Sequence, residues 1–432
     1  MFGWEFPPFK SGGLGTHCYG LTKAMSSKNV QITFVMPKAP GKVHSDAVKL
    51  LAANQISSYQ VGQDGNLKLI SATSSLYSPY MTPAQYQAML SRHSDLIRRN
   101  KNILSMKGGR VLIADDTAAS PSSSPDYGWG LYDEVYRYAL KAAEIASIED
   151  FDVIHCHDWM TYQAGMKAKE VSGKPLVVTV HSTGFDRTGG NPNPYEYDVE
   201  KAGMMAADRI IAVSKYTKSM IVQHYGINPD KINVVYNAVE QKGYNAKKIK
   251  LDEKDKVVLF LGRITIQKGP DYFVSAARKV LDVEPNVKFV VTGTGDMLGW
   301  MINEVAWRGM ADKFIFTGFM TGKDVDRLYK MADLYVMPSI SEPFGITPLE
   351  AIKNGTPALI SHQSGVSEVL QHVLKVDFWD IDEMANKIVA VLRYSALSHT
   401  LNQHSTIEVQ SMTWEKVADD TLGVYHRAMG GF

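Results

Sequence analysis

Cysteine is scarce in this sequence, and neither sign of charge is in excess. Of its 432 residues only Cys18 and Cys156 are cysteines. Two cysteines are too few for the disulfide framework of a secreted domain, so a reducing compartment is indicated. The formal net charge of +1 gives no overall field that would attract nucleic acid or an anionic membrane.

Long apolar runs are also missing. No stretch approaches the roughly 20 residues that a membrane-spanning helix needs. The opening MFGWEFPPFKSGGLG has prolines and glycines where a signal peptide would be apolar. We therefore expect a cytoplasmic protein with no stable membrane insertion and no nucleic-acid partner. The sequence leaves the oligomeric state open.

Short apolar runs alternate with longer helical patterns, such as residues 132–148, 271–283 and 381–392. The runs are rich in Val and Ile and lack polar alternation, which is typical of parallel strands covered on both faces. This order predicts α/β doubly wound sheets. The expected strands are residues 30–36, 153–156, 176–180, 209–213, 231–235, 257–261, 287–291, 314–317, 334–337 and 357–360.

The length predicts two domains rather than one. A polar, lysine-rich stretch at residues 237–255 follows one predicted strand, and a new βαβ series starts at Val257. We therefore place a first domain at residues 1–238 and a second at residues 239–412.

Two glycine-containing loops follow predicted strands. KSGGLG, from Lys10 to Gly15, precedes a helical pattern, where backbone N–H groups can approach an anion; a plain tight turn is the alternative. It is no dinucleotide fingerprint, because the third glycine is replaced by Cys18. GRITIQKGP carries Arg263 and Lys268, two cations that suit a diphosphate, although a solvated loop would look the same.

Histidines end two other strands. In HCHDW a metal site is conceivable, but His155 and Cys156 are adjacent on a strand and point to opposite faces, so they cannot converge on one ion. His157 or Asp158, at the strand end, could instead face a cleft. His181 follows the buried run LVVTV, either as a structural residue or at the ligand-binding edge of the sheet.

Two glutamates lie in PSISEPFGITPLEAIKNGTPALI. Thr347 and Glu350 fit a capping box, with Thr347 at the N-cap, so Glu350 has a structural role available. Glu342 has none. Both come from one local turn, whereas the carboxylates of a glycosidase face each other across the scissile bond. A glycosidase pair is therefore disfavoured.

Together these motifs resemble the retaining GT-B glycosyltransferases, the clan of glycogen and starch synthases and family 4. The match runs from residue 6 to about residue 420, with Glu342 and Glu350 as its most specific element. The motifs that carry it are FPPFKSGGLG, HCHDW, VTVHS, VSKYT, VVYNAV, LGRITIQKG, VVTGTGDM, FTGF, PSISEPFGITPLEAIKNGTPAL, SGVSEV and TWEKVA.

The resemblance implies the GT-B fold, two Rossmann-like domains facing a central cleft, with a helix at residues 413–432 crossing back to the first domain. It implies a metal-independent hexosyltransferase without a cofactor, whose donor is an ADP- or UDP-sugar. The implied reacting groups are His181, Arg263, Lys268 and Glu342. The implied donor-binding residues are Lys10, Gly12, Gly13, Asp158, Asn237, Phe319, Gly345, Ile346, Thr347, Glu350, Gly365 and Val366.

Individual roles follow from the same resemblance. Arg263 and Lys268 would hold the diphosphate, with backbone N–H groups of Gly13, Gly365 and Val366. Glu350 would bind the ribose and Phe319 would lie by the base. Glu342 and His181 would contact the donor sugar from opposite domains. The expected reaction is glucose transfer to the non-reducing end of an α-1,4-glucan, as in a glycogen synthase.

Other readings stay open. A family 4 enzyme could build another polysaccharide or a glycolipid. A metal-dependent GT-A enzyme would use Asp-x-Asp, and Asp150 and Asp152 fit that pattern but precede their strand. A non-catalytic protein would bind the sugar nucleotide without turnover. An epimerase would need no acceptor, and a phosphorylase would need a pyridoxal lysine.

Overall fold

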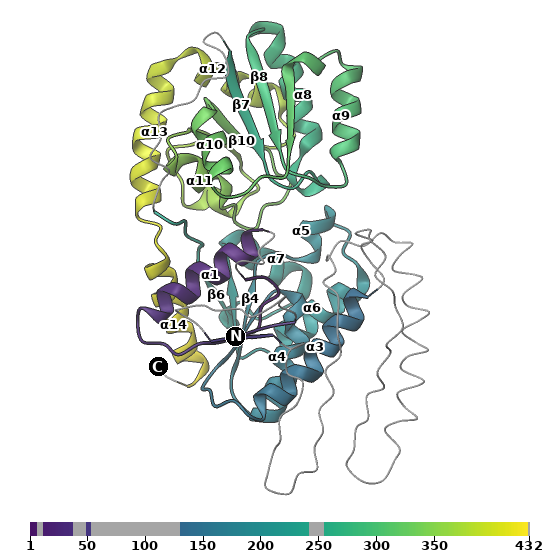
Figure 1. Cartoon of the computed structure of the whole chain (residues 1–432), viewed down its shortest axis with the longest axis vertical. Helices are drawn as coiled ribbons and strands as arrows, with labels where there is room; N and C mark the ends of the chain where they lie inside the picture. Colours follow the sequence, from purple (N-terminus) through teal and green to yellow (C-terminus); the bar gives the residue numbers. More distant parts are fainter. Residues whose placement is uncertain (7–11, 38–48, 53–129, 242–254, 431–432) are drawn as a thin grey trace, which may run out of the picture.

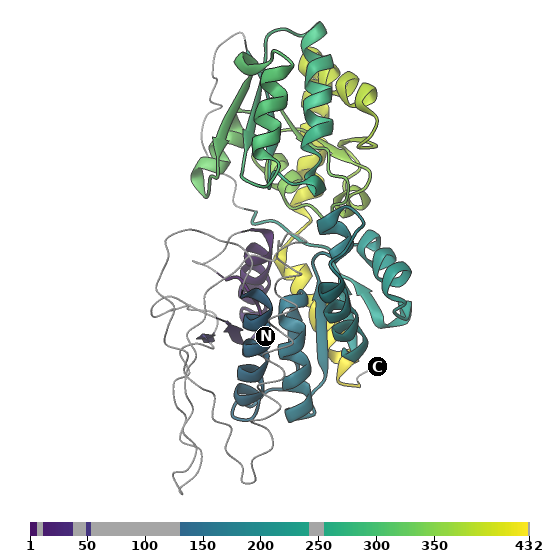
Figure 2. The same ribbon diagram turned by 90° about the vertical axis from the view of Figure 1, so that its right-hand side faces the viewer.

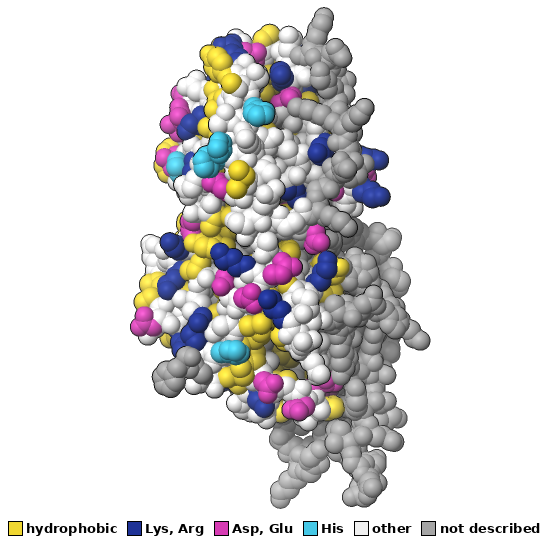
Figure 3. Space-filling model, turned by 90° about the vertical axis from the view of Figure 1, so that its left-hand side faces the viewer, with side chains coloured by type: hydrophobic (Ala, Val, Ile, Leu, Met, Phe, Trp, Pro, Cys, Tyr) yellow, Lys and Arg dark blue, Asp and Glu magenta, His cyan; other side chains and the backbone are white. Residues whose placement is uncertain are grey.

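The computed structural model describes residues 1–6, 12–37, 49–52, 130–241 and 255–430, in two α/β domains stacked end to end (Figures 1 and 2). Lys10 lies outside the described residues. Lys, Arg, Asp and Glu side chains are interspersed over the face shown in Figure 3, as the low net charge predicts. Across the described residues no helix combines the length and apolarity needed to cross a membrane.

The N-terminal domain contains parallel strands in one twisted layer. Phe2 forms bridges to both Val35 and Cys156, so the first apolar segment joins two groups of strands. The resulting order is β2, β1, Phe2, β3, β4, β5, β6. The strands are β1 (Thr33–Met36), β2 (Lys49–Ala52), β3 (Ile154–His157), β4 (Leu176–Val180), β5 (Arg209–Ala212) and β6 (Ile232–Val234).

Helices cover both faces of this sheet. One apolar core packs α3 and α4 against β3 and β4, and a second lies under α1 and the C-terminal helix. The helices are α1 (Gly13–Ser26), α3 (Leu131–Ala146), α4 (Trp159–Ser172), α5 (Gly184–Thr188), α6 (Pro194–Ala206), α7 (Lys215–Tyr225) and the 3₁₀ turn η2 (Pro229–Lys231).

The C-terminal domain has a six-stranded parallel sheet in the order β12, β11, β10, β7, β8, β9. Numbered from β7, this is the 3-2-1-4-5-6 order of a Rossmann fold, which binds ligands where the order reverses. The strands are β7 (Lys256–Leu261), β8 (Val287–Thr292), β9 (Phe314–Gly318), β10 (Leu334–Met337), β11 (Ala358–Ser361) and β12 (Leu374–Val376).

Helices and 3₁₀ turns also cover both faces of the second sheet, over two further apolar cores. They are η3 (Ile266–Lys268), α8 (Pro270–Val283), α9 (Leu298–Trp307), η4 (Ala311–Lys313), α10 (Lys323–Met331), α11 (Thr347–Lys353), η5 (Gly365–Glu368), α12 (Ile381–Arg393) and α13 (Ser395–Gln410). The prediction of two Rossmann-like doubly wound domains is therefore confirmed.

The last helix, α14 (Trp414–Ala428), returns to the N-terminal domain and packs against α1, β4 and β5 (Figure 1). Its first residue, Trp414, lies so close to α1 that a Cβ at Gly20 would come within 2.2 Å of the indole ring. The boundary between residues 238 and 239 stays a prediction, because residues 242–254 lie outside the described part of the chain.

A buried ion network fixes the end of the N-terminal domain that faces its neighbour. The Arg187 guanidinium on α5 donates to Glu196 at 2.8 Å and to Glu200 at 2.7 Å, both on α6. All three side chains are at most 5% exposed. Burial alone would lower the pKa of Arg187, but the two carboxylates together outweigh it and raise the pKa. Glu200 also accepts a hydrogen bond from the Tyr225 hydroxyl.

Arg187→Met should lower the free energy of unfolding by about 3–5 kcal/mol, because it leaves two buried carboxylates without their cation. Urea unfolding followed by circular dichroism measures this loss. Lys167→Met is the matched control, since the exposed pair of Lys167 and Glu170 should contribute less than about 1 kcal/mol. Equal effects of the two substitutions would contradict the assignment.

Candidate active site

The candidate site lies where the strand order reverses in each of the two sheets. In the C-terminal domain the order reverses between β7 and β10, and a small cavity opens there at their carboxyl ends. Lys268 and Thr347 are among the residues that line it. In the N-terminal domain the reversal lies between Phe2 and β3, so α1 and the end of β3 occupy the equivalent position.

Two cations and a carboxylate meet at the C-terminal switch point. The Lys268 ammonium, at the end of η3, forms an ion pair with Glu342; the two side chains are 21% and 10% exposed. Arg263 donates to the Gln267 side chain at 3.4 Å, and burial lowers its pKa while Glu342 opposes that effect. The predicted residues Arg263, Lys268 and Glu342 are therefore brought together.

The loop that carries Glu342 is firmly held. Ser339 donates to the Glu342 carboxylate at 3.3 Å, and the Glu342 backbone bonds to Gln363 and Gly365. Gly345 has a φ of 96°, and a Cβ there would come within 3.1 Å of the Glu342 side chain. The glycine therefore allows the sharp turn that places the carboxylate.

Glu350 lies in the first turn of α11, next to the same loop. The Tyr329 hydroxyl donates to its carboxylate at 3.1 Å. Glu342 and Glu350 thus belong to different hydrogen-bond sets, and they do not form a facing catalytic pair. The two distinct roles, Glu342 at the sugar and Glu350 at the ribose, stay predictions.

The predicted capping box is wrong. Helix α11 begins at Thr347 itself, its N-cap is Ile346, and no side chain caps it. The Thr347 hydroxyl is instead 2.7 Å from the hydroxyl of Tyr335 on β10, which donates to it. The Thr347 hydroxyl therefore bonds to the buried Tyr335 side chain and not to a backbone N–H group of its own helix. Thr347, the first residue of α11, lines the cavity.

The expected free amides of the SGVSEV segment are also absent. Gly365 N–H donates to the carbonyl of Glu342 at 2.9 Å, and Val366 N–H donates to that of Phe344 at 2.7 Å. Both groups hold the glutamate loop in this structure, and their binding of a diphosphate stays a prediction. Their contribution is to support the loop that carries Glu342.

His181 lies on the opposite wall, directly after β4. Its backbone N–H donates to the Asp158 carboxylate at 2.7 Å, and Ser182 N–H donates to the same oxygen at 3.3 Å. Asp158 is the N-cap of α4 and has a left-handed φ of 63°. Burial raises its pKa to about 7. Asp158 therefore fixes the orientation of the backbone at His181 and Ser182.

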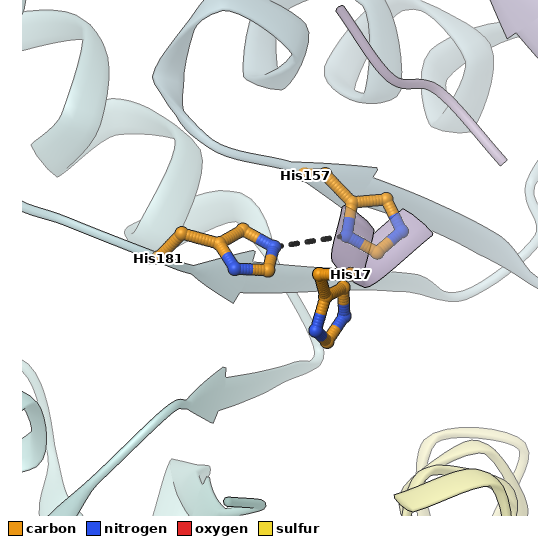
Figure 4. Close-up of side chains that lie close together, drawn as sticks. All are labelled: His17, His157 and His181. Atoms are coloured by element: carbon orange, nitrogen blue, oxygen red, sulfur yellow. Dashed lines mark hydrogen bonds between the residues drawn. The ribbon is translucent and has the colours of Figure 1, made fainter. Parts of the chain in front are cut away.

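Three histidines converge beside this loop, His17 from α1, His157 from β3 and His181 (Figure 4). His157 Nδ1 is 3.2 Å from His181 Nε2. His17 Nδ1 is 2.8 Å from the Asn237 side-chain oxygen, so the predicted residue Asn237 reaches this wall. Burial lowers the pKa of all three, that of His17 to about 4, so the rings are neutral at pH 7.

The remaining predicted positions fall around the same junction. Gly12 is the N-cap of α1, and a Cβ on Gly13 would lie 4.0 Å from the Ile346 side chain of the other domain. Phe319 follows β9 and is 62% exposed. Asp150 and Asp152 precede β3, at the strand end opposite to the site, which disfavours the Asp-x-Asp alternative.

One contact across the domains was missed by sequence reasoning. The Ser341 hydroxyl, next to Glu342, donates to the Asp186 carboxylate on α5. The same hydroxyl is 2.8 Å from the Tyr216 hydroxyl on α7. Burial raises the pKa of Asp186. Helices α5 and α7 of the N-terminal domain thus both bond to Ser341, the residue beside Glu342. Each partner is more than 120 positions away from Ser341 in the sequence.

Glu368, at the end of η5, makes a second contact across the domains. Its carboxylate accepts from the backbone N–H groups of Lys215 and Tyr216 at 3.0 and 2.7 Å, and from the Tyr236 hydroxyl at 3.0 Å. It thereby satisfies orphan donors at the start of α7, where the helix dipole favours a negative charge.

Glu368→Ala should loosen this junction, because the first turn of α7 loses an acceptor worth about 1–2 kcal/mol. We expect amide exchange in residues 214–217 and 341–345 to become about 5–30 times faster. Hydrogen–deuterium exchange with mass spectrometry measures the change. Glu383→Ala removes an equally acidic residue from α12, where it pairs with Lys387, and should leave both segments unchanged.

Two family descriptions match consecutive parts of the chain. Residues 110–242 match "Glycosyltransferase Family 4" and residues 242–406 match "Glycosyl transferases group 1". An uncharacterized glycosyltransferase of Methanocaldococcus jannaschii is 32% identical over 308 residues, which cover 67% of this chain and 78% of that protein. A D-inositol 3-phosphate glycosyltransferase of Segniliparus rotundus is 29% identical over 300 residues, covering 65% and 67%.

Solved structures share the fold. Sucrose-phosphate synthase from Thermosynechococcus elongatus superposes with a TM-score of 0.71 at 17% identity, covering 99% of this chain and 96% of that one. Anabaena HepE in complex with UDP-glucose gives a TM-score of 0.55 at 18% identity, covering 67% and 82%. The switch-point geometry, the family matches and these likenesses agree, and the chain belongs to the GT-B glycosyltransferases of family 4.

Proposed function

We propose that this glycosyltransferase is a retaining, metal-independent enzyme that transfers glucose from ADP- or UDP-glucose to the non-reducing end of an α-1,4-glucan. The observation that carries the proposal is the paired Lys268 and Glu342 at the C-terminal switch point, with Arg263 beside them. This arrangement offers two cations to a diphosphate and one carboxylate to a sugar.

The ion pair explains how the site holds its charge before the donor binds. Glu342 compensates Lys268 in a setting where an unpaired half-buried cation would be costly. A bound diphosphate would pair with the Lys268 ammonium in place of Glu342. The Glu342 carboxylate would then be available to the sugar hydroxyls. The two cations would then stabilise the negative charge that develops on the leaving diphosphate.

Retention is proposed from the resemblance to the retaining GT-B enzymes, and the wall opposite the donor bears only on how it would be achieved. The groups described there are His17, His157 and His181, neutral imidazoles, and Asp158, which is occupied by two backbone N–H groups. None of these is a free carboxylate nucleophile. We infer that the acceptor hydroxyl attacks from the face that the diphosphate leaves, and that the departing phosphate takes the proton.

The relatives favour a second candidate acceptor. Several carry the name D-inositol 3-phosphate glycosyltransferase, at 25–29% identity. A phosphorylated polyol is therefore the acceptor to test beside the glucan. For the donor, HepE structures contain UDP and UDP-glucose, which supports a uridine nucleotide as the first one to offer.

Nucleoside-diphosphate release from the purified protein tests the function. UDP-glucose, ADP-glucose and other donors are offered with glycogen, with inositol phosphate or without acceptor, each with and without a chelator. We expect glycogen-dependent release that survives the chelator. Release that depends on inositol phosphate instead would identify a phosphorylated polyol, and not the glucan, as the acceptor. Donor binding without release under any condition would favour a non-catalytic protein.

Lys268→Ala should lower kcat by roughly 10²–10³, the cost of removing one preorganised donor to the leaving group. Steady-state kinetics with the active donor and acceptor measure the loss. Lys279→Ala is the matched control, because Lys279 on α8 forms an exposed pair with Asp382 and should leave kcat unchanged. A near-normal rate in Lys268→Ala would remove the lysine from the mechanism.

A further inference from the structure

The histidine cluster has the composition of a metal site. His17, His157 and His181 each offer one ring nitrogen, and these atoms all lie within 4.8 Å of one another. The three rings come from α1, the end of β3 and the residue after β4, and they lie close together, with nitrogens of His157 and His181 directed at each other (Figure 4). Imidazole suits zinc and other transition metals, whereas magnesium and calcium prefer oxygen ligands.

The distances suit a tetrahedral ion. Zinc binds histidine nitrogen at about 2.0–2.1 Å, which places two such nitrogens roughly 3.3–3.4 Å apart. His157 Nδ1 and His181 Nε2 are 3.2 Å apart. The ring centroids are separated by 4.4 Å (His17 and His181) and 5.5 Å (both pairs with His157). Small side-chain shifts would bring all three onto one ion.

The rings are also prepared for coordination. The buried His17 Nε2 has no hydrogen-bond partner among the described residues. The other nitrogen of His17 is held by the Asn237 oxygen, which leaves the Nε2 lone pair available. Such an outer partner fixes the tautomer and direction of a metal-binding histidine.

The surroundings define the open position. His17 and His157 are buried at 4% and 0% exposure, whereas His181 is partly exposed. Asp158 fixes the His181 backbone but is bound to two N–H groups, so it is not needed as a ligand. Three histidines with a fourth position open to water or substrate are a recurrent zinc arrangement.

We propose that His17, His157 and His181 form a binding site for a divalent transition metal ion such as Zn²⁺, and that its occupancy inhibits glycosyl transfer. The inhibitory half rests on the proposed function, in which His181 faces the donor sugar. An ion that holds the His181 ring withdraws it from that contact. The ion is therefore a regulator of the site, and catalysis proceeds without it.

Metal binding is tested first and without activity. The metal-free protein is titrated with Co²⁺, and the visible absorption of a tetrahedral ion is recorded; Zn²⁺ affinity follows from competition with a chromophoric chelator. We expect one equivalent per chain. His157→Asn should weaken metal binding by more than about 100-fold, and so should His181→Asn, at a partly exposed position. This loss is larger than that expected when only a hydrogen-bond partner of a metal ligand is removed.

Exposed histidines require a control. His372 and His404 stack at 4.8 Å on the surface, beside Glu408, and this pair could bind an ion adventitiously. His404→Asn should leave the tetrahedral absorption and the chelator competition unchanged. No binding by the wild-type protein, or loss of binding in His404→Asn alone, would overturn the site.

Inhibition is measured separately, in the wild-type enzyme with its active donor. One equivalent of Zn²⁺ should lower turnover at least 10-fold and raise the apparent KM for the donor, and a chelator should restore both. Tight binding with unchanged turnover would overturn the inhibitory role and keep the site. If no donor is turned over, the proposed function fails, and the Co²⁺ absorption still decides the metal site.

Discussion

The ion pair between Lys268 and Glu342 is the interaction on which the rest of the site depends. It joins the two loops that leave β7 and β10 at the switch point of the C-terminal sheet. Its geometry is not secured within that domain alone, because the neighbouring residue Ser341 is bonded to Asp186 and Tyr216. The contacts between the two domains and the placement of the Glu342 carboxylate are therefore linked, so a hinge motion would alter both together.

Much of the fold could be predicted from the sequence because parallel strands buried on both faces leave continuous Val- and Ile-rich runs. The run at residues 257–261, for example, became β7 (Lys256–Leu261), and the helical pattern at residues 381–392 became α12 (Ile381–Arg393). Arg263 and Lys268 could be predicted as neighbours since both lie in one short loop after a strand. Local pattern was sufficient wherever the deciding contacts were local.

The predictions that failed concern groups whose partners lie far away in the sequence. Thr347 fitted a capping box, but its hydroxyl accepts a hydrogen bond from Tyr335 instead. Ser341 and Asp186 are 155 positions apart, and no periodicity signals their contact. The histidine cluster was missed for the same reason. Adjacent His155 and Cys156 were weighed as ligands and rejected, whereas the rings that converge come from three separate elements.

The two walls of the site differ in charge, and this difference assigns the substrates. The C-terminal wall carries Arg263 and Lys268, which suit a diphosphate. On the N-terminal wall the single cation Arg187 is already paired with two carboxylates, Glu196 and Glu200, and burial lowers the pKa of the histidines. These residues therefore offer no unpaired cation to a diphosphate. This difference in charge supports the proposal that the diphosphate of the donor binds the C-terminal domain.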